Sequence, residues 1–310
     1  MKKDNLTKTW IVAVLAVVCC MLWGSAITAI KTGYRLMNID ASDTAAIILF
    51  AGLRFTLAGV LVLVFESIRQ RKAVRLTSSI LKLAFPLCLA QTVGQYFFFY
   101  VGVANTSGVK SSIINGLGNF FAILLSCLVF RTEKFTGRKF AGCVLGFAGV
   151  AVMNLMGNQL DMGFRLSGEG ALTASQAAYA LSTVLINIFS QKEAPVLLSG
   201  CQFFIGGLML TGIGFCMGGR IHTVTGAAFL ILLYLAFVSA AAYTLWSVLL
   251  AHNEVSKVAV YGFVNPLFSI FLSAAVLGEF RQAFHAGTLT ALLLISAGIF
   301  IVNRVPKQKV

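Results

Sequence analysis

Ten stretches of this sequence are apolar over the length that a helix needs to cross a bilayer. A bilayer core about 30 Å thick takes roughly 20 apolar residues per helical crossing. The stretches are residues 10–30, 44–65, 80–101, 108–130, 140–156, 168–189, 195–217, 227–250, 255–277 and 284–302. A helix of this kind satisfies its own backbone hydrogen bonds inside lipid. The chain is therefore predicted to be an all-α polytopic membrane protein with ten transmembrane helices.

The composition of the chain supports this fold class. Hydrophobic residues make up 58% and charged residues 11% of the sequence, whereas soluble domains are about 25% charged. The first span follows Lys2, Lys3 and Lys8, as the apolar core of a signal peptide would. It is longer than such a core, and further spans follow it, so we expect it to remain as an uncleaved first helix.

The basic residues lie mostly on one side of the predicted membrane. The formal net charge is +14, and with the amino end inside, 17 of the 24 Lys and Arg residues fall on the inner side and five on the outer side. Cytoplasmic loops carry an excess of this kind. Both termini are therefore predicted to be cytoplasmic, in a multi-pass protein of the inner (cytoplasmic) cell membrane. Because topology explains the charge, the expected partner is the lipid bilayer and not a nucleic acid.

One stretch of the first half returns in the second half. Residues 107–133 and 253–279 align without a gap at an offset of 146 residues. The identical pairs are Val109 with Val255, Gly116 with Gly262, Asn119 with Asn265, and Glu133 with Glu279. The copies lie in the fourth and ninth predicted spans, five spans apart, so one copy is inverted relative to the other. The sequence predicts two inverted five-helix repeats, residues 1–157 and 158–310.

Several short motifs occur in the order and spacing of a known family. They are Leu22-Trp23-Gly24-Ser25, Leu53-Arg54-Phe55, Glu133-Lys134-Phe135-Thr136, Val264-Asn265-Pro266-Leu267-Phe268 and Gly278-Glu279. Through them, nearly the whole chain resembles the ten-helix EamA type of the drug/metabolite transporter superfamily. Phe120 departs from the family pattern, which often has a proline there, whereas Pro266 supports a kink in the ninth span. The resemblance implies two inverted five-helix bundles around a central cavity, and transport of small metabolites.

Polar residues repeat at helical spacing along five of the predicted spans. Positions three and four apart share a helix face, and a polar face within a membrane must meet protein or a wet cavity. We predict a cavity surrounded by the first, third, fourth, sixth, eighth and ninth spans. The predicted substrate-binding residues are Gln91, Gln95, Asn115, Asn119, Gln176, Tyr179, Thr183, Tyr243, Trp246, Tyr261 and Asn265, together with Arg54 of the second span. For each single residue, hydrogen bonding between helices is the alternative.

Two basic residues fall within the predicted spans. Arg54 lies ten residues into the second span, where a charge costs about 2.5 to 3.5 kcal/mol on insertion scales. It is expected either to contact an anion in the cavity or to bond the helix-end carbonyls of a neighbouring helix. Lys110 is the third residue of its span, and either reaches the outer interface or adds a cation to the cavity mouth.

The types of residue that are missing from the predicted spans exclude several classes of function. None of the ten acids lies deep in a span, and a carrier of organic cations would need one, so a neutral, zwitterionic or anionic cargo is predicted. The seven cysteines lie in apolar runs without metal-ligand spacing, and neither a metal nor a cofactor is expected. The three histidines lie in loops, and without a nucleophile and base together in the spans an enzyme is not expected.

These features together predict a secondary transporter that works by alternating access. Its expected cargo is a small metabolite, neutral or zwitterionic, such as an amino acid, moved outward. The alternatives are export of drug-like, anionic or phosphorylated compounds, and a channel, although the sequence has no charged ring or selectivity filter.

Two groups of glycines are expected to let helices approach closely. Gly142, Gly146 and Gly149 form a seam in the fifth span, which predicts packing against a neighbouring helix or against a second copy in a homodimer. The glycines of the seventh span, Gly206, Gly207, Gly212 and Gly214, are expected to provide either flexibility or close packing.

Overall fold

The computed structural model describes residues 6–40, 42–106, 108–155, 164–223, 225–268, 272 and 286–304. Nearly all of these residues are helical, and none of them belongs to a strand. The predicted all-helical fold class is confirmed for this part of the chain. Glu279 and the repeat boundary predicted at residue 157 lie outside the described residues, as do the side chain of Lys110 and parts of the last two predicted spans.

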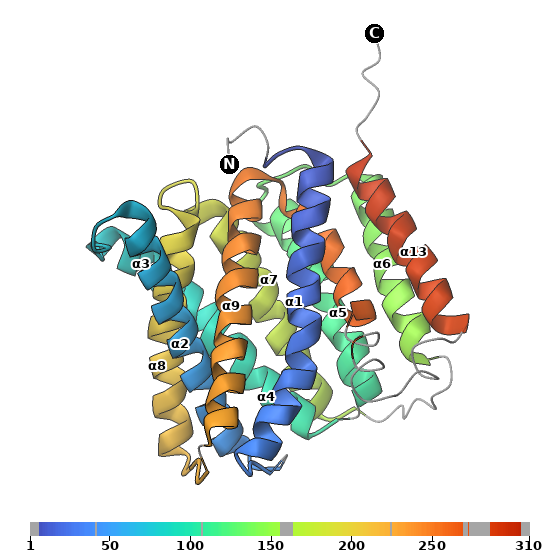
Figure 1. Ribbon diagram of the computed structural model, residues 1–310. Coiled ribbons are helices and arrows are strands. Elements are labelled where there is room, and N and C mark those ends of the chain that lie inside the picture. The colour runs from blue at the N-terminus through green and yellow to red at the C-terminus, as the bar shows by residue number, and fades with distance from the viewer. Residues whose placement is uncertain are drawn as a thin grey trace.

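The first half of the chain forms helices that are joined by short turns (Figure 1). They are α1 (Thr9–Leu36), α2 (Thr44–Gln70), α3 (Ser78–Leu87), α4 (Tyr96–Ala104), α5 (Gly108–Leu124) and α6 (Gly137–Leu155). A π-helical segment, η2 (Cys88–Gln95), joins α3 to α4, and another, η3 (Leu125–Val129), continues α5. The span predicted at 80–101 is therefore one continuous helical segment with wider turns in its middle.

The second half begins with a short π-helical segment, η4 (Leu166–Gly170), which leads into α7 (Ala171–Phe189). Two long helices follow, α8 (Pro195–Cys216) and α9 (Gly226–His252). The ninth predicted span starts as α10 (Val255–Ala259) and continues through a 3-10 segment, η5 (Val260–Val264), into helical residues 265–268. The last helix is α13 (Ala286–Asn303).

Five helices in the described part of the chain are long and apolar enough to cross a membrane. They are Thr9–Leu36, Thr44–Gln70, Leu166–Phe189, Pro195–Cys216 and Gly226–His252. Two shorter apolar helices, Ile114–Val129 and Gly287–Asn303, coincide with two further predicted spans. The chain is a multi-pass helical membrane protein, and the total of ten crossings stays a prediction.

Local sequence sets where several helices begin. At the start of α2 the Asp43 carboxylate accepts from the Ala46 N–H at 2.9 Å. At the start of α9 the Thr225 hydroxyl accepts from the Ala228 N–H at 3.1 Å. These caps satisfy N–H groups that lack a partner in the first helical turn. Pro195 opens α8, at a position where its missing N–H costs no helical hydrogen bond.

Helices α2 and α8 pack side by side along one edge of the bundle (Figure 1). A Cβ on Gly52 would lie 2.7 Å from the Thr211 Cα, and one on Gly59 would lie 2.6 Å from the Phe204 Cα. The partner numbers fall as the glycine numbers rise, so the two helices are antiparallel. The glycines of α8 are also packed: a Cβ on Gly214 would lie 2.8 Å from the Leu49 Cα. Gly212 is the exception, because it has open space around it.

Helices α6 and α13 form a second close pair at the other edge (Figure 1). A Cβ on Gly142 would lie 2.8 Å from the Gly298 carbonyl oxygen, and one on Gly149 would lie 3.0 Å from that of Ala291. Gly146 packs against the Phe263 ring. The small-residue seam of the fifth span is thus occupied by neighbours within the chain.

The first turn of α1 and the last turn of α13 lie at the same end of the bundle (Figure 1). We call this end the termini end. Helix α1 runs away from it and α2 returns toward it, so the first residues of α2 lie at the opposite end.

Candidate functional site

A cavity of about 300 Å³ lies between the helices of the two halves. Its wall is built from α1, α2, the end of η2 with α4, α5, α6, α7, α9 and the ninth predicted span. Eight of the twelve predicted binding residues line it: Arg54, Gln95, Asn115, Asn119, Gln176, Tyr179, Tyr243 and Asn265. The six spans expected around the cavity all contribute, and Arg54 of α2 and Val150 of α6 complete the wall.

The other four predicted residues lie away from the cavity wall. Gln91 is buried and accepts a hydrogen bond from the Gln202 Nε2 at 2.5 Å, which pairs η2 with α8. Thr183 turns back onto its own helix and donates to the Tyr179 carbonyl at 2.9 Å. For these two residues, bonding between or within helices is the observed arrangement.

Trp246 and Tyr261 are buried in the apolar core beside the cavity. The Trp246 ring meets the Trp23 ring edge-on, with centroids 5.0 Å apart. The polar face of a helix is wider than the part of that face that one cavity contacts. Residues at the margin of the polar face therefore pack against neighbouring helices. Sequence spacing alone does not distinguish residues at the margin of the polar face from residues at its centre.

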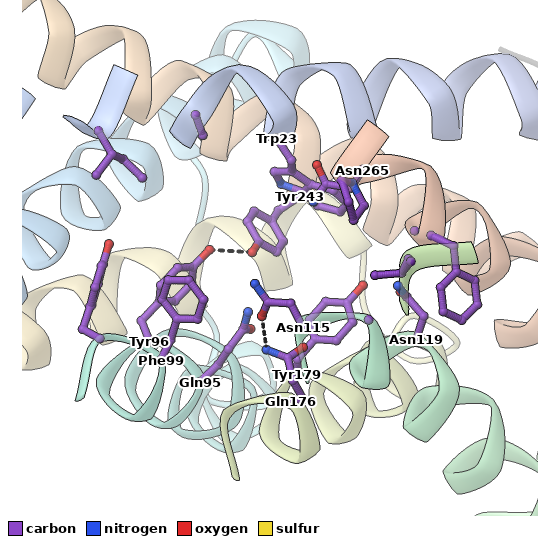
Figure 2. A pocket seen from close by; sticks show the side chains of 18 of the residues that line it. Trp23, Gln95, Tyr96, Phe99, Asn115, Asn119, Gln176, Tyr179, Tyr243 and Asn265 are labelled. Atoms are coloured by element: carbon purple, nitrogen blue, oxygen red, sulfur yellow. Dashed lines mark hydrogen bonds between the residues drawn. The ribbon is translucent and has the colours of Figure 1, made fainter. Parts of the chain in front are cut away.

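Of the aromatic residues that line the cavity, Tyr179 and Tyr243 were predicted from the sequence and five others were not. Trp23, Tyr96, Phe99, Tyr100 and Phe263 all line the cavity. The Tyr96 and Tyr243 hydroxyls are hydrogen bonded at 2.6 Å (Figure 2). In an apolar span, such aromatics look like core or lipid-facing residues, and the available signals were the position of Tyr96 next to Gln95 and of Trp23 in a family-like motif.

Arg54 is a buried cation in the cavity wall. The residue is 2% exposed, and its Nε donates to the Ser239 hydroxyl of α9 at 2.9 Å. Its guanidinium carbon lies 5.1 Å from the centroid of the Phe55 ring. Among the described residues, no carboxylate forms a salt bridge with Arg54. Its observed partner is a serine hydroxyl rather than the helix-end carbonyls considered from the sequence.

Several polar atoms of the cavity wall are buried without a protein partner. They are the Trp23 Nε1, the Gln95 Oε1, the Asn119 Oδ1 and the Asn265 Oδ1. Buried polar atoms are nearly always hydrogen bonded in folded proteins. By contrast, the Gln176 Nε2 donates to the Asn115 Oδ1 at 2.6 Å (Figure 2). Three amide oxygens and one indole N–H of wall residues therefore lack a hydrogen-bond partner in this structure.

The repeated residues of the two halves meet at this cavity. A Cβ on Gly262 would lie 2.7 Å from the Asn119 Cγ, so only a glycine leaves room for the asparagine of the other copy. Asn265, the counterpart of Asn119, lines the same cavity. Both copies of the repeated stretch therefore contribute to one site.

A buried network of hydrogen bonds and ion pairs lies near the termini end. The Glu133 carboxylate accepts from the Ser126 hydroxyl at 2.5 Å, the Lys139 Nζ at 2.7 Å and the Ser256 hydroxyl at 2.6 Å. It also accepts from the Ser256 N–H at 3.1 Å, at the start of α10. Lys139 reaches Glu254 as well, at 3.1 Å. The network joins the first half of the chain to the second.

Glu254, between α9 and α10, is the more exposed acid of this network. Burial favours its neutral form, but the hydrogen bond and charge of Lys139 outweigh that effect and hold the pKa of Glu254 below its ordinary value. A lowered pKa means that the ion pair with Lys139 stabilises the fold above the ordinary carboxyl pKa and is lost as the pH falls through the lowered value. The pair therefore persists across neutral pH.

A polar cavity buried between the helices of a multi-pass membrane protein is the arrangement of a small-molecule membrane transporter. The chain belongs to the EamA-like transporter family, whose sequence model matches residues 10–155 and 166–304. The resemblance to the EamA type of the drug/metabolite transporter superfamily, predicted from the motifs, is confirmed.

Relatives of this chain are also named as transporters. The uncharacterized transporter YvbV of Bacillus subtilis is 29% identical over 269 residues, which cover 84% of each chain. An uncharacterized transporter of Archaeoglobus fulgidus is 25% identical over 301 residues, covering 96% of this chain and 99% of that one. A solved crystal structure superimposes with a TM-score of 0.75 at 17% identity, covering 94% of this chain and 96% of the other. At that identity the likeness concerns the fold alone.

Proposed function

We propose that this protein is a secondary transporter that moves a small neutral or zwitterionic metabolite, such as an amino acid, outward across the cytoplasmic membrane by alternating access. The observation that carries the proposal is the cavity, because both halves line it and several of its buried polar atoms have no protein partner. Such atoms favour a polar ligand over an empty apolar cavity.

The packing of the helices supports two inverted five-helix repeats within this proposal. If α1 corresponds to α7, α2 to α8 and α6 to α13, the repeat mates α2 and α8 pair with each other, and so do α6 and α13. In the same scheme the third span, which contains η2, corresponds to α9. The contact between α1 and α9 then corresponds to the contact between α7 and η2. The antiparallel run of α2 against α8 is the relation expected of inverted mates. The two separate matches to the family model agree with this division.

The position of the cavity supports an arrangement open away from the termini. Arg54, Asn115 and Gln176 lie in the first halves of α2, α5 and α7, which start at the end opposite the termini if the crossings alternate. The Glu133 network ties the two halves together near the termini end. With cytoplasmic termini, as the basic residues predict, the cavity faces outward and the Glu133 network holds the inner side closed.

The charges of the cavity wall support the proposed cargo. Among the described residues, the wall contains one cation, Arg54, and no acidic residue. An organic cation would meet repulsion there without a compensating carboxylate, whereas a zwitterion or an anion would be attracted. A purely anionic or phosphorylated cargo is the second candidate, and Arg54 is the observation in its favour.

Counterflow in proteoliposomes tests the proposal. Vesicles preloaded with a pool of neutral amino acids and related metabolites should take up a labelled member of that pool through the intact protein. Because two cavity amides are removed, the Asn119→Ala, Asn265→Ala double variant should lower the exchange rate about tenfold or more. Asn105→Ala, which removes an exposed amide outside the cavity, is the control and should exchange normally. Equal exchange by a folded double variant contradicts the cavity assignment.

A further inference from the structure

The turn between α2 and α3 carries a cluster of cations without acidic partners. Arg71, Lys72 and Arg75 lie in this turn, and all three are exposed. Among the described residues, none of them forms a salt bridge. In the sequence no acid occurs between Glu66, near the end of α2, and Glu133. The turn therefore presents a net positive charge at the termini end of the bundle, beside α8 (Figure 1).

Glu66 does not neutralise the turn, because its carboxylate is fully buried and is used within α2. It accepts from the Arg69 Nε at 2.7 Å and from the Arg69 Nη2 at 2.5 Å. It also accepts from the Gln70 Nε2 at 2.6 Å. The charge of Glu66 is thus balanced by Arg69, and the three cations of the turn are left for a partner outside the chain.

Arg71 adopts a backbone conformation that glycine usually provides. Its φ is 53° and its ψ is 29°, in the left-handed region. The Arg71 N–H donates to the Ile68 carbonyl at 3.1 Å. The Lys72 N–H donates to the Ser67 carbonyl at 3.2 Å. These two bonds close the helix in a motif that commonly has glycine at this position. A side chain there costs stability, which points to a use of the Arg71 guanidinium outside the fold.

Exposed apolar side chains flank the cations on both helices. At the end of α2, Phe65 is 61% and Ile68 is 71% exposed. Leu76 follows the cations and is exposed, as are Leu81 and Phe85 of α3. Leu81 and Phe85 are four residues apart, so they share one helix face. The cations therefore lie at the end of a surface that suits acyl chains.

We infer that the turn between α2 and α3 binds an acidic phospholipid, with its cations on the headgroup phosphate and Phe65 and Ile68 against the acyl chains. Arginine and lysine both donate to phosphate oxygens, and arginine does so with parallel N–H groups. Basic clusters next to a membrane helix attract acidic lipids, with a gain of about fivefold in affinity per charge. The inference does not depend on the cargo of the cavity.

Thermal unfolding of the purified full chain in a neutral detergent tests the inference. Phosphatidylglycerol should raise the unfolding temperature, and the concentration that gives half of the rise reports the affinity. Phosphatidylcholine with the same acyl chains has no net charge and should raise the temperature much less. Glycerol 3-phosphate has the phosphate without acyl chains and should have no effect. An equal effect of phosphatidylcholine or of glycerol 3-phosphate would overturn the acidic lipid as the ligand.

Variants separate the side chain of Arg71 from its backbone. Without lipid, Arg71→Gly should unfold at the same or a higher temperature, because glycine suits the left-handed conformation. Its half-maximal phosphatidylglycerol concentration should nevertheless rise about fivefold. The Arg71→Gly, Lys72→Gln, Arg75→Gln variant removes all three charges and should raise that concentration about a hundredfold. An unchanged response of this triple variant would overturn the inference.

Arg131→Gly is the matched control for Arg71→Gly. Arg131 is exposed and has a φ of 52° just after η3, but it lies two residues from the Glu133 carboxylate. The control removes one charge from the same conformation, and its response to phosphatidylglycerol should stay normal. Equal losses in Arg71→Gly and Arg131→Gly would show a general effect of surface charge, and would overturn a defined site in the turn between α2 and α3.

Discussion

At the scale of single residues, Arg54 and Glu133 are both buried charges with opposite surroundings. Glu133 is satisfied within the chain by Ser126, Lys139 and Ser256. Arg54 has a hydroxyl partner but no carboxylate among the described residues. A buried charge needs either a partner or a ligand. This contrast supports Glu133 as a structural anchor between the halves and Arg54 as a candidate ligand contact.

The anchor can be tested by removing its charge. Glu133→Gln leaves Lys139 without its buried partner, and we expect a loss of stability of about 3 kcal/mol or more, because the lysine stays largely buried. Glu254→Gln is the matched control. The Glu254 side chain is 48% exposed, so its loss should cost no more than about 1 kcal/mol. Thermal unfolding in detergent measures both, and an equal effect of the two variants would count against the anchor.

At the scale of helices, glycines decide which neighbours come closest. In α8, Gly200, Gly207 and Gly214 recur every seven residues and face α2. Seven residues are close to two helical turns, so these glycines lie along one face. Close backbone approach of this kind supplies the van der Waals packing that holds helices together in lipid. Flexibility is therefore not needed to explain the glycines that face α2.

A pair of alanine substitutions tests this packing. Gly207→Ala should destabilise the fold by about 1 to 3 kcal/mol, because its Cβ would lie 2.7 Å from the Phe55 carbonyl carbon. Gly212→Ala is the control in the same helix, where nothing lies within 4 Å. It should leave the unfolding temperature unchanged or slightly raised, because alanine favours a helix. A similar fall in both variants would contradict the packing interpretation.

At the scale of the whole molecule, the two chain ends define the topology. The start of α1 and the end of α13 lie on one side of the bundle (Figure 1), which requires an even number of crossings between them. The excess of basic residues predicts that this side is cytoplasmic. The cavity and the Glu133 network then lie toward opposite faces of the membrane.

Reporter fusions test the orientation. We expect a green fluorescent protein at the carboxyl end to fluoresce and an alkaline phosphatase at the same end to stay inactive, because that end is predicted to be cytoplasmic. Fusions after Asn105, in the turn between α4 and α5, should give the reverse result. The same response at both positions would contradict either the orientation or the even number of crossings.

Much of this architecture could be predicted from residue types and their order. Long apolar runs must become helices in lipid, since no water is present to satisfy an open backbone. Paired motifs such as Asn119 with Asn265 predicted an internal repeat, and both residues line one cavity. Polar residues in apolar spans pointed to the helices that surround it. These features depend on composition and periodicity, which are properties of the sequence itself.

The tertiary structure decided which polar residues face the cavity and which pair with neighbours. Gln91 and Gln95 have the same chemistry and lie one turn apart, yet Gln91 is bonded to Gln202 and Gln95 lines the cavity. The difference depends on where α8 crosses η2, which no local pattern contains. Most of the aromatic wall was likewise not predicted from the sequence, because a ring in an apolar span suits lipid, core and cavity equally. Contacts between distant segments set these roles. Helical spacing shows which residues share a face, but it does not show which face meets the cavity.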